Sequence, residues 1–399
     1  MTIKELSYGH YISIALVQSL SMFGIGFSIF YMNGGGIIDW SFNDADHYRE
    51  IAQLGYHNEF TPAFFPALPY LWKILNVSPL GMGLINGLVW IVTASFVGKE
   101  FKMKAASFAL GMAMPMAVFF FIPYSESLFA LGITLILIGL NRSKLTQILL
   151  GIFICSITRP TILVLVPAVI LGLLFFQSLL PKARSIFWTV LTAIAGLFVV
   201  LLIQRMDTGS WTSFIEAQQA WGNSLSWPQW PLRTWGQGIN LILDGTALWF
   251  GLLSGVSFFL LLREEDASPK NSPTLMALSF VAGTCLLVLF TRGGFLFSLS
   301  RFVFASPLIL LVVHRLISIK PTKKSLAWMA TSIVLFGIAL GAYEHIITWL
   351  QFLAVGAFVT GSWIIWNKNR PILKWLVIAL MLGLQGYVCS LFLFGDWIA

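Results

Sequence analysis

The chain has 399 residues, of which 58% are hydrophobic and only 10% are charged. Soluble globular domains have about 45–50% apolar and about 25% charged residues, so this chain has too few charges to cover a water-exposed surface. Its composition excludes a soluble enzyme, a disordered chain and a nucleic-acid-binding domain, and it predicts a polytopic protein of the lipid bilayer. The net charge of +8 requires no nucleic-acid partner, because the basic residues are distributed as membrane topology demands.

Apolar runs between polar breaks predict one all-α integral membrane domain over residues 1–399 with about thirteen spans, since a helix crosses a bilayer core of about 30 Å with about 20 residues. The spans lie near 10–32, 81–98, 105–121, 127–140, 145–158, 161–179, 186–204, 244–262, 274–290, 302–317, 325–342, 346–366 and 372–393. Arg159-Pro160 divides an apolar block over 145–180, and proline interrupts helices, so we expect two short helices that meet at Arg159. Residues 306–399 form the C-terminal transmembrane helices.

Most of the 24 basic residues fall on one side of the membrane if the N-terminus is cytoplasmic, which satisfies the positive-inside rule. All but one of the basic residues on the outer side are arginines, which suit phosphate or carboxylate binding: Arg49, Lys73, Arg159, Arg205, Arg233, Arg292 and Arg301. Two long outer segments, 33–80 and 205–243, are rich in aromatic residues, Pro and Gly, and they predict interfacial helices in the first and fourth outer loops. Any chemistry therefore belongs on the outer face, and the short loops favour a bacterial plasma membrane.

The first outer loop holds a cluster of acidic residues directly after the first span: Asp39, Asp44, Asp46, Glu50 and Glu59, beside His47 and His57. A helix that begins at Asp44 places Asp44, His47 and Tyr48 on one face. The Asp44 carboxylate then either caps this helix or acts as a general base at a membrane-facing cleft. Asp46 is the second candidate base, but it lies about 200° further round the helix, so the two carboxylates do not easily serve one site.

The loop reads Asp44-x-x-His47-Tyr48-x-x-Ile51-Ala52-x-x-Gly55-Tyr56 and continues with Phe64-Phe65-Pro66-x-x-Pro69. Further motifs follow on the predicted outer face: Pro123-Tyr124-Ser125-Glu126-Ser127, Thr158-Arg159-Pro160, Gln218-x-x-Trp221-Gly222 and Ser300-Arg301-Phe302. Together they resemble the GPI second-mannosyltransferase (PIG-V-like) family and its prokaryotic relatives over residues 40–305. The sequence departs from the eukaryotic pattern at Asn43, where that pattern has tryptophan.

The resemblance implies a GT-C type fold and a glycosyltransferase that takes a sugar from a polyprenyl-phosphate carrier at the extracytoplasmic face. It also implies mannose as the sugar, residues 33–80 as the catalytic loop, and Asp44 as the catalytic base. The acceptor is a glycolipid, a glycan or a protein hydroxyl. A single carboxylate with direct attack at the anomeric carbon predicts inversion. No cofactor and no metal site are expected, and a divalent cation beside Asp44 and Asp46 is kept as an alternative.

The donor phosphate needs cations, and three outer arginines are candidates. Arg301 opens a span after Arg292-Gly293-Gly294, a position suited to a bidentate phosphate grip; the alternative is an interfacial arginine with a buried stem. Arg159 lies at a helix break, where a charge is costly unless it is paired or functional. It therefore contacts the donor phosphate or pairs with Glu126. Arg292 is a weaker phosphate candidate.

Other side chains are candidates for binding the sugar. Glu126 either caps the following helix or orients a sugar hydroxyl. Gln218 and Trp221, three residues apart, present an amide and an aromatic ring on one helix face, or Trp221 anchors the loop at the interface. His47 is expected to form hydrogen bonds within its loop. The substrate-binding candidates are thus Asp46, His47, Tyr48, Glu126, Gln218 and Trp221.

The alternative function is a transporter or flippase for lipid-linked saccharides. Such a protein carries its charged groups near the middle of the bilayer. Here the charges outside the cytoplasmic loops lie at the predicted outer edge of the spans, which favours the enzyme.

Overall fold

The computed structural model describes residues 6–38, 40–175, 182–235, 238–263, 271–341, 346–368 and 370–396, so Asp39 of the acidic cluster lies outside the described residues. The α-helices are α1 (Tyr8–Met32), α2 (Asp44–Leu54), α3 (Ala67–Leu75), α4 (Pro79–Glu100), α5 (Ala105–Met112), α6 (Glu126–Asn141), α7 (Leu145–Thr158), α8 (Ile162–Leu174), α9 (Lys182–Thr208), α10 (Ser213–Ala220), α11 (Ile239–Arg263), α12 (Ser272–Thr291), α13 (Leu299–Phe304), α14 (Leu308–Ser318), α15 (Lys323–Ala339), α16 (Ile346–Asn367) and α17 (Pro371–Leu393). Two 3-10 helices, η1 (Thr61–Ala63) and η2 (Pro115–Phe120), complete the list. No β-strand occurs in the described ranges, and the predicted all-α class is confirmed.

The lengths and hydropathy of the helices identify a multi-pass membrane protein. Among the described residues, seven helices are long and apolar enough to cross a bilayer: α1, α4, α9, α11, α12, α16 and α17. Four further apolar helices of 10–17 residues, α6, α7, α8 and α14, are shorter than the roughly 20 residues that an upright span needs. The count of thirteen spans and the cytoplasmic N-terminus stay predictions.

Several of the predicted spans are divided at proline residues. The expected break at Arg159-Pro160 is confirmed, because α7 ends at Thr158 and α8 begins at Ile162. The prediction of one continuous helix over 105–121 is wrong: α5 ends at Met112, and a 3-10 helix begins at Pro115. The predicted span 302–317 is likewise split between α13 and α14 by the segment before Leu308. Proline has no N–H to donate and clashes with the preceding turn, so the apolar character of a run does not make it one helix.

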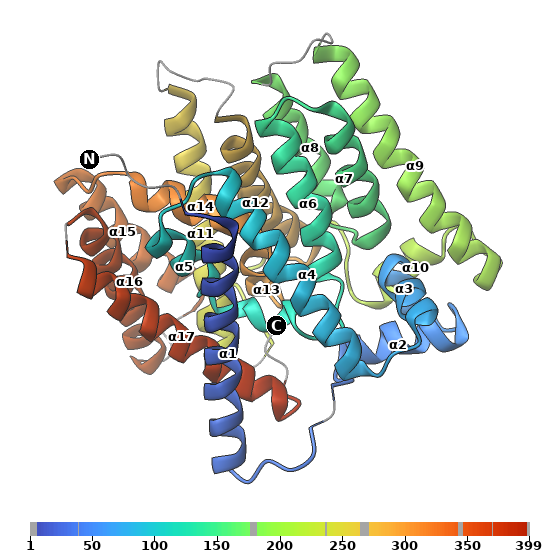
Figure 1. Ribbon diagram of the computed structural model, residues 1–399, viewed down its shortest axis with the longest axis horizontal. Coiled ribbons are helices and arrows are strands. Elements are labelled where there is room, and N and C mark those ends of the chain that lie inside the picture. The colour runs from blue at the N-terminus through green and yellow to red at the C-terminus, as the bar shows by residue number, and fades with distance from the viewer. Residues whose placement is uncertain are drawn as a thin grey trace.

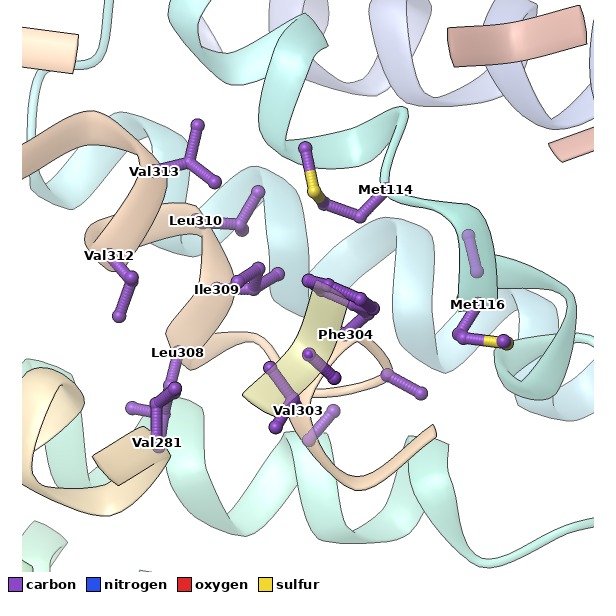
Figure 2. Close-up of a cluster of buried hydrophobic side chains, with 14 of the residues drawn as sticks. Met114, Met116, Val281, Val303, Phe304, Leu308, Ile309, Leu310, Val312 and Val313 are labelled. Carbon is purple, nitrogen blue, oxygen red and sulfur yellow. The ribbon is translucent and has the colours of Figure 1, made fainter. Parts of the chain in front are cut away.

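Helix α12 packs at the centre of the bundle against α8, α11 and α14. Helix α1 contacts α4 and α17, and α9 runs along one edge of the molecule, where it packs against α7 and α8 (Figure 1). The short helix α13 lies in the interior, where its Val303 and Phe304 are buried among Met116, Leu308 and Ile309 (Figure 2). Apolar packing on this scale, about 1.5–3 kcal/mol for each fully buried side chain, holds α13 in place inside the bundle.

A layer of short helices, α2, η1, α3 and α10, gathers at one corner of the molecule (Figure 1). These helices come from the two segments predicted as long outer loops. The layer has a hydrophobic core of its own, formed by Tyr48, Ile51, Ala52, Tyr56, Phe64, Leu68, Trp72 and Met82. Helix α9 contacts this layer through Ile203, which packs against that core, and through the Gln204 side-chain amide, which donates a hydrogen bond of 2.7 Å to the carbonyl oxygen of Pro62. The segment predicted as the first outer loop is therefore folded rather than an open loop.

Gly55 ends α2 in a backbone conformation that only glycine adopts readily, with φ 75° and ψ −166°. A Cβ atom there would lie 2.7 Å from Asp207 Oδ2, the atom that accepts a hydrogen bond of 3.0 Å from the Tyr56 N–H. We expect Gly55→Ala to lower the free energy of unfolding by about 1–3 kcal/mol, as measured by SDS-induced unfolding in mixed micelles. The control is Gly36→Ala, since a Cβ at Gly36 meets no atom within 4 Å. Equal losses in the two variants would contradict this explanation.

Candidate active site

A cavity of about 360 Å³ lies between the layer of short helices and the ends of α8, α12 and α13. Its polar lining includes Asp44, Tyr48, Arg159, Gln218, Asn223, Arg292 and Arg301. Its aromatic lining includes Phe64, Phe65, Phe214, Trp221, Phe297 and Phe302. Apolar walls with a few convergent polar groups are typical of a small-molecule site.

A second cavity of about 340 Å³ lies between α11 and the C-terminal helices α14 to α17. Its walls are almost entirely apolar, and none of the described residues that line it is charged. The cavity beside Asp44, in contrast, brings charged side chains together. The cavity beside Asp44 is the candidate active site.

Four charged side chains form one connected network at the wall of this site. The Arg301 guanidinium donates through Nη1 to Asp44 Oδ2 at 2.5 Å and through Nε to Glu126 Oε1. Arg159 Nη1 also contacts Glu126 Oε1, at 2.6 Å. The Glu126 side chain is fully buried, and the Asp44 side chain is 15% exposed and reaches the cavity. Arg301 thus joins a buried carboxylate to one that faces the cavity.

The local sequence places both carboxylates at helix starts. Asp44 is the first residue of α2, as predicted, and its N–H donates to the hydroxyl of Tyr124 at 3.2 Å. Its carboxylate binds Arg301, so Asp44 does not act merely as a helix cap. Glu126 is the first residue of α6 and binds both arginines. Carboxylates at these positions are stabilised by the positive end of the helix dipole.

Three guanidiniums, those of Arg159, Arg292 and Arg301, line the cavity beside one carboxylate, that of Asp44, whereas the Glu126 and Asp244 carboxylates are buried outside the lining. Arg301 and Arg292 also lie over aromatic rings, at 4.5 Å from the centre of Tyr124 and 3.8 Å from the centre of Phe297. Burial lowers the pKa of Arg292 to about 10, so this side chain is protonated at neutral pH. Burial raises the pKa of Tyr48, so Tyr48 stays neutral and donates a hydrogen bond of 2.8 Å to Ser125 Oγ. Such a site favours an anionic ligand.

A chain of hydrogen bonds connects the large outer loop to the end of α12. Asn223 accepts from Arg292 Nε at 2.9 Å and donates to Gln218 Oε1 at 2.8 Å. Arg292 Nη1 also donates to the carbonyl oxygen of Phe297. Sequence reasoning missed Asn223, whose only signal is its place directly after the motif that ends at Gly222. Gln218 is therefore held at the cavity through a residue that no spacing rule singled out.

The remaining predicted side chains divide between the cavity and its surroundings. Trp221 lines the cavity, and its indole N–H donates to the carbonyl oxygen of Phe60 at 3.2 Å. His47 stacks on Phe64 with ring centres 4.9 Å apart and contacts Trp221 edge-on, so it supports the aromatic wall from behind. Asp46 is exposed and is not part of the lining. Of the two candidate bases, only Asp44 reaches the cavity.

The part of the chain that the structure describes holds no group of three His, Cys, Asp or Glu side chains arranged to bind a metal ion. No protein-family model, curated protein or solved structure matches the chain. The resemblance of its motifs to the PIG-V-like family therefore stays a prediction. The geometry of the cavity is the independent evidence about function.

Removing the charge of Glu126 tests the network. Glu126→Gln leaves two buried guanidiniums without their shared counterion, so we expect the free energy of unfolding to fall by about 3–5 kcal/mol. Glu50→Gln is the control, because it removes a carboxylate from a pair with His57 in which the two side chains are 34% and 38% exposed, and exposed pairs contribute about 0–1 kcal/mol. SDS-induced unfolding of both variants measures the difference. Losses of similar size would show that the buried network does not stabilise the fold.

Proposed function

We propose that the chain is a glycosyltransferase that moves a sugar from a polyprenyl-phosphate donor to an acceptor hydroxyl. The observation that carries this proposal is the position of Arg301, which joins Asp44 to Glu126 at the wall of a cavity that Arg159 and Arg292 also line. A carboxylate beside several guanidiniums provides both a proton acceptor and an anion site. These are the two groups that transfer from a sugar phosphate requires.

Asp44 acts as the general base in the proposed reaction. Its Oδ2 binds Arg301, and its Oδ1 forms no hydrogen bond with any described residue, so Oδ1 is open to the hydroxyl of an acceptor. The acceptor O–H loses its proton to Asp44 while its oxygen attacks the anomeric carbon from the face opposite the phosphate. The bond from that carbon to the phosphate oxygen breaks, and the lipid phosphate leaves with the electron pair. One displacement inverts the anomeric configuration.

The arginines stabilise the charge that grows on the leaving phosphate. Arg301 Nη2 has no hydrogen-bond partner among the described residues, and it is available to a phosphate oxygen. Arg159 and Arg292 line the same cavity and supply further donors with the planar geometry that suits phosphate. Phosphate is already a good leaving group, so a strong general acid is not required.

The family resemblance supports the finer parts of the proposal. The motifs around Asp44, Glu126 and Arg301 resemble those of the PIG-V-like family. On that basis we propose mannose as the sugar, a GT-C type fold, and a glycolipid, glycan or protein hydroxyl as the acceptor. The distribution of basic residues supports an active site on the outer face of a bacterial plasma membrane, with the N-terminus in the cytoplasm. In this arrangement Gln218 and Trp221 bind the sugar through an amide and an aromatic ring at the cavity.

The alternative, a transporter of lipid-linked saccharides, agrees less well with the position of the charges. Glu126 and Asp44 start their helices, and Arg159 is the residue that follows the last residue of α7. Transporters of this kind bind their substrates near the middle of the bilayer between discontinuous helices. Charged side chains at helix ends suit a reaction at the membrane surface better than they suit the transport of a saccharide across the membrane.

Asp44→Asn removes the proposed base with little change in size. A general base contributes about 10²–10⁴-fold to a rate, so we expect sugar transfer to fall by that factor. The measurement is release of polyprenyl phosphate from polyprenyl-phosphate-mannose in membranes that contain the chain and supply the acceptors. The control is Glu59→Gln, which removes an exposed carboxylate from the same outer segment. Transfer by Asp44→Asn at the rate of the unaltered chain would remove Asp44 from the base role.

A further inference from the structure

A buried carboxylate lies behind the candidate site and is not part of its lining. Asp244, in the first turns of α11, is 2% exposed. Its Oδ1 accepts a hydrogen bond of 2.9 Å from the backbone N–H of Ser300, and its Oδ2 accepts one of 2.5 Å from the hydroxyl of Thr234. Burial of a carboxylate costs free energy unless the group is hydrogen-bonded. The two groups that bind Asp244 therefore indicate which segments it stabilises.

The first bond compensates for a weak helix start. Helix α13 has only six residues, and the residue before it, Ser298, has φ 63° and makes no side-chain cap. The first N–H groups of a helix have no partner inside the helix. Asp244 satisfies one of them from a different helix, at Ser300, the residue that directly precedes Arg301. The beginning of α13 is thus fixed by α11 rather than by its own sequence.

The second bond fixes the segment that runs beside the loop leading to α13. The Leu296 N–H donates to the carbonyl oxygen of Arg233 at 2.6 Å, and the Arg233 N–H donates to that of Gly294 at 3.2 Å. Thr234, the next residue of this segment, binds Asp244. Asp244 therefore binds both of the segments that pair here: the one that contains Thr234 and the one that leads through Ser300 to Arg301.

We propose that Asp244 is a positioning residue for Arg301. The inference rests on the proposed function, because it assigns Asp244 a role in that reaction. The Arg301 guanidinium contacts two carboxylates at once, and this arrangement tolerates little movement of its backbone. A displacement of about 1 Å at a catalytic group can lower a rate by about 10²-fold. Asp244 does not contact the substrate and acts through the placement of α13.

Three substitutions separate positioning from simple destabilisation. Asp244→Ala removes both bonds, Thr234→Val removes one, and Asp244→Asn keeps an acceptor for Ser300 and gains an N–H that donates to Thr234. We expect kcat to fall by about 10²-fold in Asp244→Ala with a smaller change in KM, to fall less in Thr234→Val, and to return close to the unaltered value in Asp244→Asn. The control is Ser254→Ala, a buried residue of α11 whose hydroxyl bonds within its own helix, to Phe250.

Hydrogen exchange measures the placement of α13 without any assay of sugar transfer. We expect the amides of Leu299–Phe304 to exchange faster in Asp244→Ala than in Asp244→Asn or in the Ser254→Ala control. Unchanged exchange, or a kcat in Asp244→Ala that matches the control, would overturn the positioning role. If Asp244→Ala does not fold, Thr234→Val carries the same comparison. If the unaltered chain transfers no sugar, the proposed function fails, while exchange in α13 and binding of polyprenyl phosphate still decide whether Asp244 places Arg301.

Discussion

The arrangement of the helices around the candidate site depends on one fully buried carboxylate. Removing an ion such as Glu126 from water costs several kcal/mol, and the fold accepts it because Arg159 and Arg301 both donate to the same oxygen. Arg301 then extends the network to Asp44, the first residue of α2. The burial of one charge therefore joins α2, α6, α13 and the end of α7 at a single point, and the cavity lies beside that point.

Three of the elements that meet there do so near their N-terminal ends. Asp44 and Glu126 are the first residues of α2 and α6, and Arg301 lies in the first turn of α13. Arg159 is instead the C-cap residue of α7, at the break before α8. Helix N-termini carry partial positive charge and favour anions. They stabilise the two carboxylates, and with the guanidiniums they leave the cavity attractive to a further anion. The helix starts at Asp44 and Glu126 thus contribute both to the packing around the cavity and to its electrostatic potential.

Two features of the site could be predicted from short stretches of sequence, because neighbouring residues determine them. Acidic residues favour helix starts and proline ends helices, so the beginning of α2 at Asp44 and the break at Arg159 could be predicted. Pro115 carries an equally local signal, but the apolar run around it concealed the division. No local rule joins Arg301 to Asp44, because tertiary packing alone brings them together. The same holds for Asn223, a loop amide without a characteristic spacing.

The partners in the Asp44–Arg301 contact are separated by 257 positions along the chain. At typical synthesis rates of 5–20 residues per second, about 10–50 s pass between the appearance of the acid and that of its arginine. During that interval Asp44 lacks its partner Arg301, because the arginine has not yet been synthesised. The wall of this cavity is therefore completed late in biogenesis, and a ribosome that stops before α13 leaves a helical bundle without the Asp44–Arg301 contact.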